Sequence, residues 1–462
     1  MAVTVRPGLG LVAALLAVAA LAAPMPTLAA SEVTFGTPGS ESSFGVGVEF
    51  RQPVETAVEV VRVELLLTFP SSIGPLVVEL PAPAGVGRAV LEHRFSLTDD
   101  GHLLPNTLVE ARWRLQTADG ERHVGPSVEV RYEDDRFSWR TVSGDIVSVH
   151  WYEGTEAFAR RALAIGEEAV AETEALLGVT ETEPIDFYVY ADVQAFYDAL
   201  GPGTRESVGG QANAEIRTLF ALITPDEIDD PWVGVVVPHE LVHLVFDTAV
   251  SNPYHFPPRW LNEGLATYLS EGYKARDRQT VEAAARAETL IPLDGLVGQF
   301  PTTREGFFLA YAESVSALDH LIQQHGEAAM VGLIRSYADG VTDDAAFEAA
   351  IGMDVAAFNA DWFASLGAVV PAPLGPRPEP PGPLPEGWVG TPPSPAPGAS
   401  STPAPPASGG SPPDEQGLER FVWPLLLGLA LGAGGGVLLA VVRGRRRGVT
   451  PPPSGPSEGP YR

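Results

Sequence analysis

The sequence predicts a multidomain protein in which an N-terminal all-β domain precedes a domain of mixed helices and strands, a Pro-rich stalk and one transmembrane helix. Three observations predict this fold class. Apolar residues alternate with period two between Val33 and Tyr132, helical periodicity appears among strands from Arg136 onward, and residues 421–442 carry no charge. Side chains repeat about every second residue along a strand and about every 3.6 residues along a helix, so a change of period marks a change of domain.

The N-terminal end has the pattern of a secretory signal. A single positive charge at Arg6 precedes an apolar run from Leu9 to Ala23, and small residues follow around Ala29 and Ala30. This order of charge, apolar core and small-residue exit is typical of a cleaved signal peptide. We therefore expect residues 1–30 to be removed and the mature chain to begin near Ser31.

The C-terminal end predicts a membrane anchor. Residues 369–420 are rich in Pro, Gly and Ser and cannot bury enough apolar surface to fold, so they predict an extended stalk. Residues 421–442 are long enough to cross about 30 Å of hydrocarbon as a helix. A buried core helix fits less well, because three consecutive glycines begin at Gly434. Four arginines follow at once: Arg443, Arg445, Arg446 and Arg447.

Basic residues remain on the cytoplasmic side of a membrane, so residues 443–462 are expected to form a short cytoplasmic tail. Everything from Ser31 to the span would then lie outside the cell, held by a single pass through the cell membrane. Gly432 and Gly436 could pack one such helix on another, but this pattern is weak in a Gly-rich span and leaves the oligomeric state open.

Charge and cysteine content exclude several classes of protein. The formal net charge is -30, and such an acidic chain repels nucleic acid and anionic lipid, so neither is an expected partner. The absence of cysteine excludes disulfides, thiol catalysis and Cys-based zinc sites.

Residues 31–135 predict a β-sandwich of immunoglobulin or fibronectin type. Val109, Ala111, Trp113 and Leu115 share one face of a strand, and polar residues take the other face. Asp119 and Gly120 form a turn signal between two such runs. Several short strands in about 100 residues are typical of sandwiches. No candidate site occurs here, and we expect a spacer or a protein-contact module.

Residues 136–368 predict the mixed domain. Amphipathic helices alternate with short apolar strands in its first half, and the part after Ala266 is mostly helical as far as Leu366. The expected elements are a strand at 146–152, a helix at 156–177 ended by Gly178, a strand at 184–190, a short helix at 193–200 and a strand at 216–223.

The pentapeptide from His239 to His243 carries the chemistry. Residues four apart lie one above the other on a helix, so both imidazoles would face one metal ion. Glu240 lies about 100° round the helix from His239, so its carboxylate would stand beside the ion, where a general base for water is needed. Asp230 and Pro231 predict the start of this helix, and Pro238 predicts a kink or a fresh helix start inside it.

A catalytic zinc usually has three protein ligands, so a third one must exist. Phe246 and Ala249 stand where a further Gly and His would be needed in one common pattern. Glu263 follows His243 after nineteen residues, enough to turn the chain and bring in a second helix, and Gly264 would let the two helices approach closely. Asp247 could orient an imidazole or could be a solvated residue near the helix end.

These residues resemble a gluzincin-type zinc metallopeptidase, and in particular the bacterial peptidase MA-like family. The resemblance spans roughly residues 137–366 and includes residues 236–238, the segment 260–266, the segment 310–314 and Trp362. It implies a zincin-like α+β fold with a sheet above the motif helix and a helical half below. It also implies that His239, His243 and Glu263 bind Zn²⁺ and that Glu240 is catalytic.

The resemblance further implies a hydrogen-bond donor for the oxyanion on the helical side. Tyr311 is the candidate, although a core tyrosine is an equal interpretation and His320 and His325 compete. If residues 216–223 form the sheet edge over the cleft, they would accept an extended peptide by strand addition.

The expected protein is a membrane-anchored extracytoplasmic zinc peptidase that acts on protein or peptide substrates. One alternative is a weak or inactive zincin scaffold that serves as a cell-envelope binding or adhesion protein. Intact Glu240 argues against that alternative. Hydrolysis of a non-peptide amide at the same metal is a third hypothesis. The sequence leaves the substrate, the choice between endo- and exopeptidase, and the oligomeric state undetermined.

Overall fold

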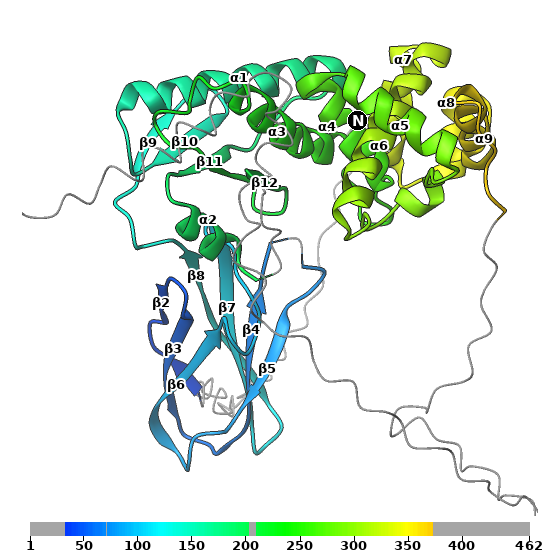
Figure 1. Ribbon diagram of the computed structural model, residues 1–462. Coiled ribbons are helices and arrows are strands. Elements are labelled where there is room, and N and C mark those ends of the chain that lie inside the picture. Colours follow the sequence, from blue (N-terminus) through cyan, green and yellow to red (C-terminus); the bar gives the residue numbers. More distant parts are fainter. Residues whose placement is uncertain (1–32, 71, 203–208, 373–462) are drawn as a thin grey trace, which may run out of the picture. The chain divides into compact units, whose positions relative to one another are not determined.

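The computed structural model describes residues 33–70, 72–202 and 209–372 (Figure 1). The predicted signal, membrane span, cytoplasmic tail and nearly all of the stalk lie outside these residues. The contacts divide the chain into two units. The N-terminal unit comprises the described residues up to Ser42, Gly47–Ser96 and Val109–Val130. The C-terminal unit comprises Ser43–Val46, Leu97–Leu108 and the described residues from Arg131 onward.

The N-terminal unit is rich in β-strands, arranged in two four-stranded sheets. Strand β7 (Thr107–Thr117) follows the expected alternation, with Val109, Ala111, Trp113 and Leu115 almost completely buried. The first sheet contains β1 (Val33–Phe35), β2 (Gly39–Ser43), β3 (Gly47–Thr56) and β6 (Gly87–Ser96). The second has the order β5-β4-β7-β8, with β4 (Val60–Thr68), β5 (Leu76–Leu80) and β8 (Arg122–Tyr132). Assignment to an immunoglobulin or fibronectin type stays a prediction.

The C-terminal unit is built on a five-stranded sheet with the order β12-β13-β11-β10-β9. The three inner strands are parallel, and the two edge strands run antiparallel to their neighbours. The strands are β9 (Arg140–Ser143), β10 (Val147–Trp151), β11 (Ile185–Tyr190), β12 (Gly210–Asn213) and β13 (Thr218–Leu222).

One expectation about this sheet is wrong. The strand expected at 216–223 exists as β13, but it lies inside the sheet, and β12 is the edge. Because β12 contributes only four residues, two of them small, it gives no periodicity signal of its own.

Helices cover both faces of the sheet (Figure 1). Ile185, Phe187 and Val189 of β11 share a core with α1 (Glu156–Leu177) and α3 (Val233–Val250). On the other face Tyr190 packs with α2 (Val193–Leu200). The predicted end of α1 is confirmed, because Gly178 caps it in a left-handed conformation with φ 64°.

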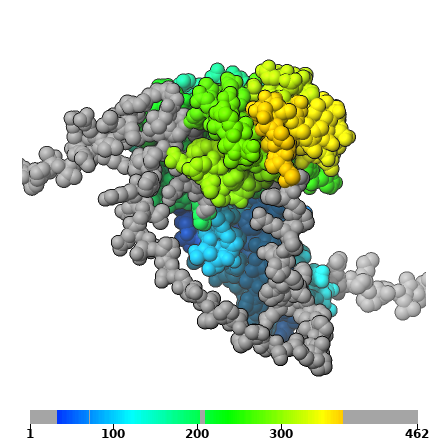
Figure 2. Space-filling view, turned by 45° about the vertical axis from the view of Figure 1, so that its right-hand side comes forward, coloured from blue at the N-terminus to red at the C-terminus, as the bar shows by residue number. Residues whose placement is uncertain are grey.

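The second half of the C-terminal unit is helical, and the last helices, yellow to orange, pack against the green helices on the face seen in Figure 2. Trp260, Phe347, Phe358 and Trp362 are completely buried among them. The elements are α4 (Arg259–Glu271), α5 (Ala275–Ala287), η1 (Leu293–Leu296), α6 (Arg304–His325), α7 (Glu327–Ser336), η2 (Tyr337–Asp339), α8 (Asp343–Ile351) and α9 (Val355–Ser365).

Gly264 permits a close approach, but not the predicted one. A Cβ atom at Gly264 would lie 2.7 Å from the carbonyl oxygen of Ser314, so this glycine brings α4 against α6. The expectation that it brings α4 against the motif helix is therefore wrong.

Helix α3 carries the pentapeptide and begins later than predicted. It runs from Val233 to Val250 as one element that contains Pro238, with Trp232 at the N-cap and no side-chain cap. The predicted cap at Asp230 and a fresh helix start at Pro238 are therefore wrong. Among the described residues, α3 is the one helix that is long and apolar enough to cross a membrane by length and composition. Its packing against α1, α4 and the sheet is that of a core helix.

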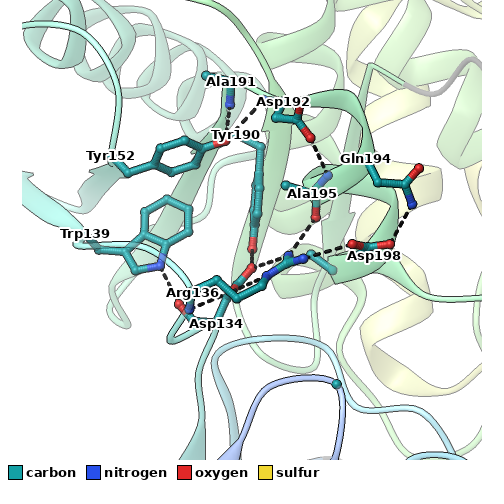
Figure 3. Close-up of polar contacts among 12 residues, drawn as sticks. Asp134, Arg136, Trp139, Tyr152, Tyr190, Ala191, Asp192, Gln194, Ala195 and Asp198 are labelled. Carbon is teal, nitrogen blue, oxygen red and sulfur yellow. Dashed lines mark hydrogen bonds and ion pairs between the residues drawn. The ribbon is translucent and has the colours of Figure 1, made fainter.

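A polar network secures the start of the C-terminal unit (Figure 3). Arg136 donates from Nε to Oδ1 of Asp134 at 2.9 Å and from Nη2 to Oδ2 at 2.7 Å. The Tyr190 hydroxyl donates to the same carboxylate at 3.1 Å, and Trp139 Nε1 donates to the Asp134 carbonyl at 2.8 Å. Arg136 also reaches Asp198 of α2. The network thus ties the segment that enters the unit to β11 and α2.

Asp134→Ala is expected to destabilise the C-terminal unit by about 3 kcal/mol, because it leaves Arg136 and Tyr190 without their shared acceptor. Asp134 is buried, whereas Asp135 is exposed, so Asp135→Ala provides the matched control. Urea denaturation monitored by tryptophan fluorescence measures both. Equal midpoints for the two variants would contradict the assigned role of the network.

Candidate metal centre

Three predicted side chains meet between α3 and α4. Nε2 of His239 and Nε2 of His243 each lie 3.5 Å from Oε2 of Glu263. One ligand atom from each of the three side chains lies within 4.8 Å of the others. The two histidines meet because they are one helical turn apart, and Glu263 joins them because α4 packs against α3.

The Oε2 atom of Glu263 is unusual in having no hydrogen-bond partner within the described residues, although it is buried. A buried carboxylate oxygen without a donor or a cation is costly. Two donors held at about 2.1 Å by one tetrahedral ion lie roughly 3.4 Å apart, close to the 3.5 Å between Oε2 of Glu263 and each imidazole nitrogen. The arrangement therefore fits a single divalent cation, and the three residues could hold one.

Asn262 fixes the orientation of His243. Nδ1 of His243 lies 2.8 Å from Oδ1 of Asn262, and because an amide oxygen only accepts, Nδ1 carries the proton. Nε2 then presents its lone pair to the side of Glu263. The sequence left open whether Asp247 orients an imidazole or is a solvated residue; for His243 the orienting partner is Asn262 and not Asp247.

Glu240 lies between this group and the edge of the sheet. Its Oε2 accepts a hydrogen bond from the backbone nitrogen of Ala212 in β12 at 2.8 Å. A Cβ atom at Gly210 would lie 2.9 Å from Val236 Cγ1 and 3.1 Å from Glu240 Cγ, so glycine is what lets β12 approach α3 so closely.

The register of β12 shows which backbone groups face outward. Leu222 donates to the Gly209 carbonyl, and the β12–β13 ladder pairs Gly210 with Ala221 in antiparallel register. Alternate residues of an antiparallel strand face their partner, so the polar groups of Gly210 and Ala212 point away from β13. This outward side of the edge is where Ala212 meets Glu240.

The charges of the group are strongly coupled. Burial raises the pKa of Glu263, but His239, His243 and Arg259 oppose it and hold that pKa well below its usual range. Burial lowers the pKa of His239, but Glu263 and Glu240 more than compensate, so its pKa is raised. A bound cation requires the ionised carboxylate and neutral imidazoles, so it would compete with the proton that the raised pKa of His239 favours.

Tyr311 lies at the same place, on α6. Its ring centroid is 6.2 Å from that of His239, and its hydroxyl interacts with Glu263 and Arg259. Burial, followed by the charge of Glu263, raises its pKa well above the usual value, so the hydroxyl keeps its proton and can donate. The competing candidate His320 lies elsewhere, 2.8 Å from Asp361.

Sequence reasoning missed three contributors. Asn262 and Arg259 stand one and four residues before Glu263, so their closeness to this ligand in the sequence could have indicated a supporting role. Ala212 acts through its backbone nitrogen, for which a side-chain pattern gives no signal.

Comparison with known proteins identifies the family. The family model of the Peptidase MA superfamily matches residues 165–368. Residues 165–368 belong to the Peptidase MA superfamily. The resemblance predicted from the sequence is thereby confirmed. None of the curated proteins compared matches the chain.

Solved structures of similar proteins include metallopeptidases. An M1 zinc metallopeptidase from Deinococcus radiodurans is 14% identical, with 76% of this chain and 97% of that chain covered and a TM-score of 0.33. An aminopeptidase N family protein from Idiomarina loihiensis is 10% identical, with 71% and 76% covered and a TM-score of 0.39. Likenesses this weak do not bear on the activity of this chain.

Proposed function

We propose that this member of the Peptidase MA superfamily is a zinc-dependent peptidase, anchored in the cell membrane with its catalytic unit outside. The observation that carries the proposal is the buried Oε2 of Glu263, which accepts no hydrogen bond from any described residue and faces two imidazole nitrogens at 3.5 Å each. Two histidines and one glutamate are a ligand set of catalytic zinc, which keeps a further position for water or substrate.

His239, His243 and Glu263 would hold the ion. Bound zinc supplies a lowered pKa for water and polarisation of the carbonyl that is attacked. Glu240 takes the proton from the attacking water and gives it to the leaving amine. The N–H of Ala212 keeps one oxygen of Glu240 occupied and leaves the other to move the proton.

The outward edge of β12 suits an extended peptide. The carbonyl groups of Gly210 and Ala212 point away from β13 and can accept hydrogen bonds from a substrate backbone, as in strand addition. Tyr311 is a neutral hydrogen-bond donor beside Glu263. It would either stabilise the oxyanion of the reaction or hold the Glu263 carboxylate in place.

The location rests on the sequence. The signal pattern at 1–30, the uncharged span at 421–442 and the arginines after it support an outward-facing ectodomain on a stalk. The N-terminal unit, with its two sheets and buried Trp113, would be an immunoglobulin- or fibronectin-like module that acts as a spacer or binds protein.

Zinc content and cleavage of a peptide library test the proposal on the full-length protein. We expect about one zinc per chain, loss of cleavage with a chelator, and recovery on adding zinc back. Stoichiometric zinc without turnover of any peptide would favour the inactive scaffold, and absence of zinc binding would contradict the peptidase proposal.

A further inference from the structure

Arg259 hydrogen-bonds to only one of the two carboxylate oxygens of Glu263. Arg259 stands one helical turn before Glu263 on α4, and its Nε and Nη2 donate to Oε1 at 3.0 and 2.9 Å. No described residue donates to Oε2, which faces the two imidazoles. The two oxygens of this carboxylate therefore have different partners.

The guanidinium is itself held in place. Its central carbon lies 4.8 Å from the ring centroid of Phe300, and the guanidinium interacts with the Tyr311 hydroxyl. The backbone nitrogen of Arg259 donates to the Val297 carbonyl at 2.8 Å. The Glu263 side chain is only 8% exposed, whereas that of Arg259 is 40% exposed, so the carboxylate end of this ion pair is the end shielded from water. Phe300 is buried and cannot move aside easily.

We propose that Arg259 is a positioning residue that makes Glu263 a one-oxygen metal ligand; this rests on the zinc site of the proposed function. A free carboxylate can rotate or can offer both oxygens to a cation. With Oε1 engaged by two donors, the carboxylate plane is fixed and only Oε2 is directed at the imidazoles. With a zinc ion bound, the position that Oε1 would otherwise take beside it would stay available for water and substrate.

Arg259→Met tests this in the full-length protein, because methionine keeps an apolar stem over Phe300 and removes both donors. Arg286→Met is the matched control: Arg286 also pairs with a glutamate one turn away, Glu282, but that pair is exposed and lies on α5. Zinc affinity is measured by competition with a chelating dye. The coordination of the ion is measured from the visible spectrum of the cobalt(II)-substituted protein.

We expect Arg259→Met to weaken zinc binding 10- to 100-fold, roughly the effect of losing a residue that orients a ligand. Its cobalt absorption should weaken as well, since a second oxygen raises the coordination number and higher coordination absorbs less. Arg286→Met should match the wild type in both. Arg259→Gln gives the same comparison if Arg259→Met does not fold.

The outcomes separate this inference from the proposed function. Wild-type protein that binds no zinc would overturn the proposed function itself. Wild-type protein that binds zinc, together with an Arg259→Met variant of equal affinity and identical cobalt spectrum, would overturn the role of Arg259 and leave the peptidase proposal intact.

Discussion

Glu240→Gln is expected to lower kcat for peptide hydrolysis on the order of 10³-fold while zinc content stays at the wild-type level. General acid–base catalysis by one side chain is worth roughly 10²- to 10⁴-fold, and the amide of glutamine cannot accept the proton. Glutamine keeps the size of the side chain and an oxygen for the Ala212 N–H, so β12 should stay in place. KM should change little for the same reason.

The measurement is peptide cleavage under zinc-saturated conditions, with zinc content determined on the same samples. Glu172→Gln, which removes an exposed carboxylate on α1, controls for the change of charge. A Glu240→Gln variant as active as the wild type would remove Glu240 from the reaction. Loss of zinc from that variant would instead make Glu240 a contributor to metal binding.

The site was predictable because its main residues obey short-range rules. The spacing of His239 and His243 fixes their common face on any helix, and Glu263 belongs to a segment whose resemblance to known metallopeptidases is specific. The supporting contacts depend on how α4 and β12 pack, which spacing alone does not determine. Asn262 rather than Asp247 therefore orients His243, and a backbone nitrogen rather than a side chain holds Glu240.

The fold was predictable where periodicity is long and strong. Helix α1 ends at Gly178 as expected, and β7 shows the expected alternation of buried and exposed residues. Local rules failed where tertiary packing dominates. Helix α3 continues through Pro238 because α1 and α4 pack it into the core. Gly264 meets α6 because α4 packs against that helix as well as against α3.

Glu313, on α6, is a buried acid that the proposed reaction does not use. Its side chain is completely buried, Oε1 accepts a hydrogen bond from the backbone nitrogen of Ile291 at 3.0 Å, and Oε2 has no partner in the described part of the chain. Burial raises the pKa of this carboxyl to about 8, against the smaller opposing effect of the Ile291 N–H. The folded protein therefore keeps Glu313 protonated at neutral pH.

This protonation links stability to pH with a definite sign. Between the ordinary glutamate pKa of 4.5 and the folded-state value of about 8, the native state holds one proton more than the unfolded state. The free energy of unfolding then falls by roughly 1.4 kcal/mol for each unit of pH. The contribution of Glu313 is complete below the unfolded pKa and is lost as pH rises to about 8.

Glu313→Gln is expected to remove this dependence, because glutamine is neutral at every pH, has the shape of the protonated acid and still accepts from Ile291. The variant should be close to the wild type in stability at pH 5 and more stable by about 4 kcal/mol at pH 8. Urea denaturation from pH 5 to 8 in zinc-containing buffer measures the difference, in which contributions from all other groups cancel. Glu305→Gln, at the exposed start of the same helix, is the control and should show no such trend. A constant difference between Glu313→Gln and the wild type across this range would mean that Glu313 is ionised in the folded protein, and that a cation or donor near Oε2 stabilises its charge.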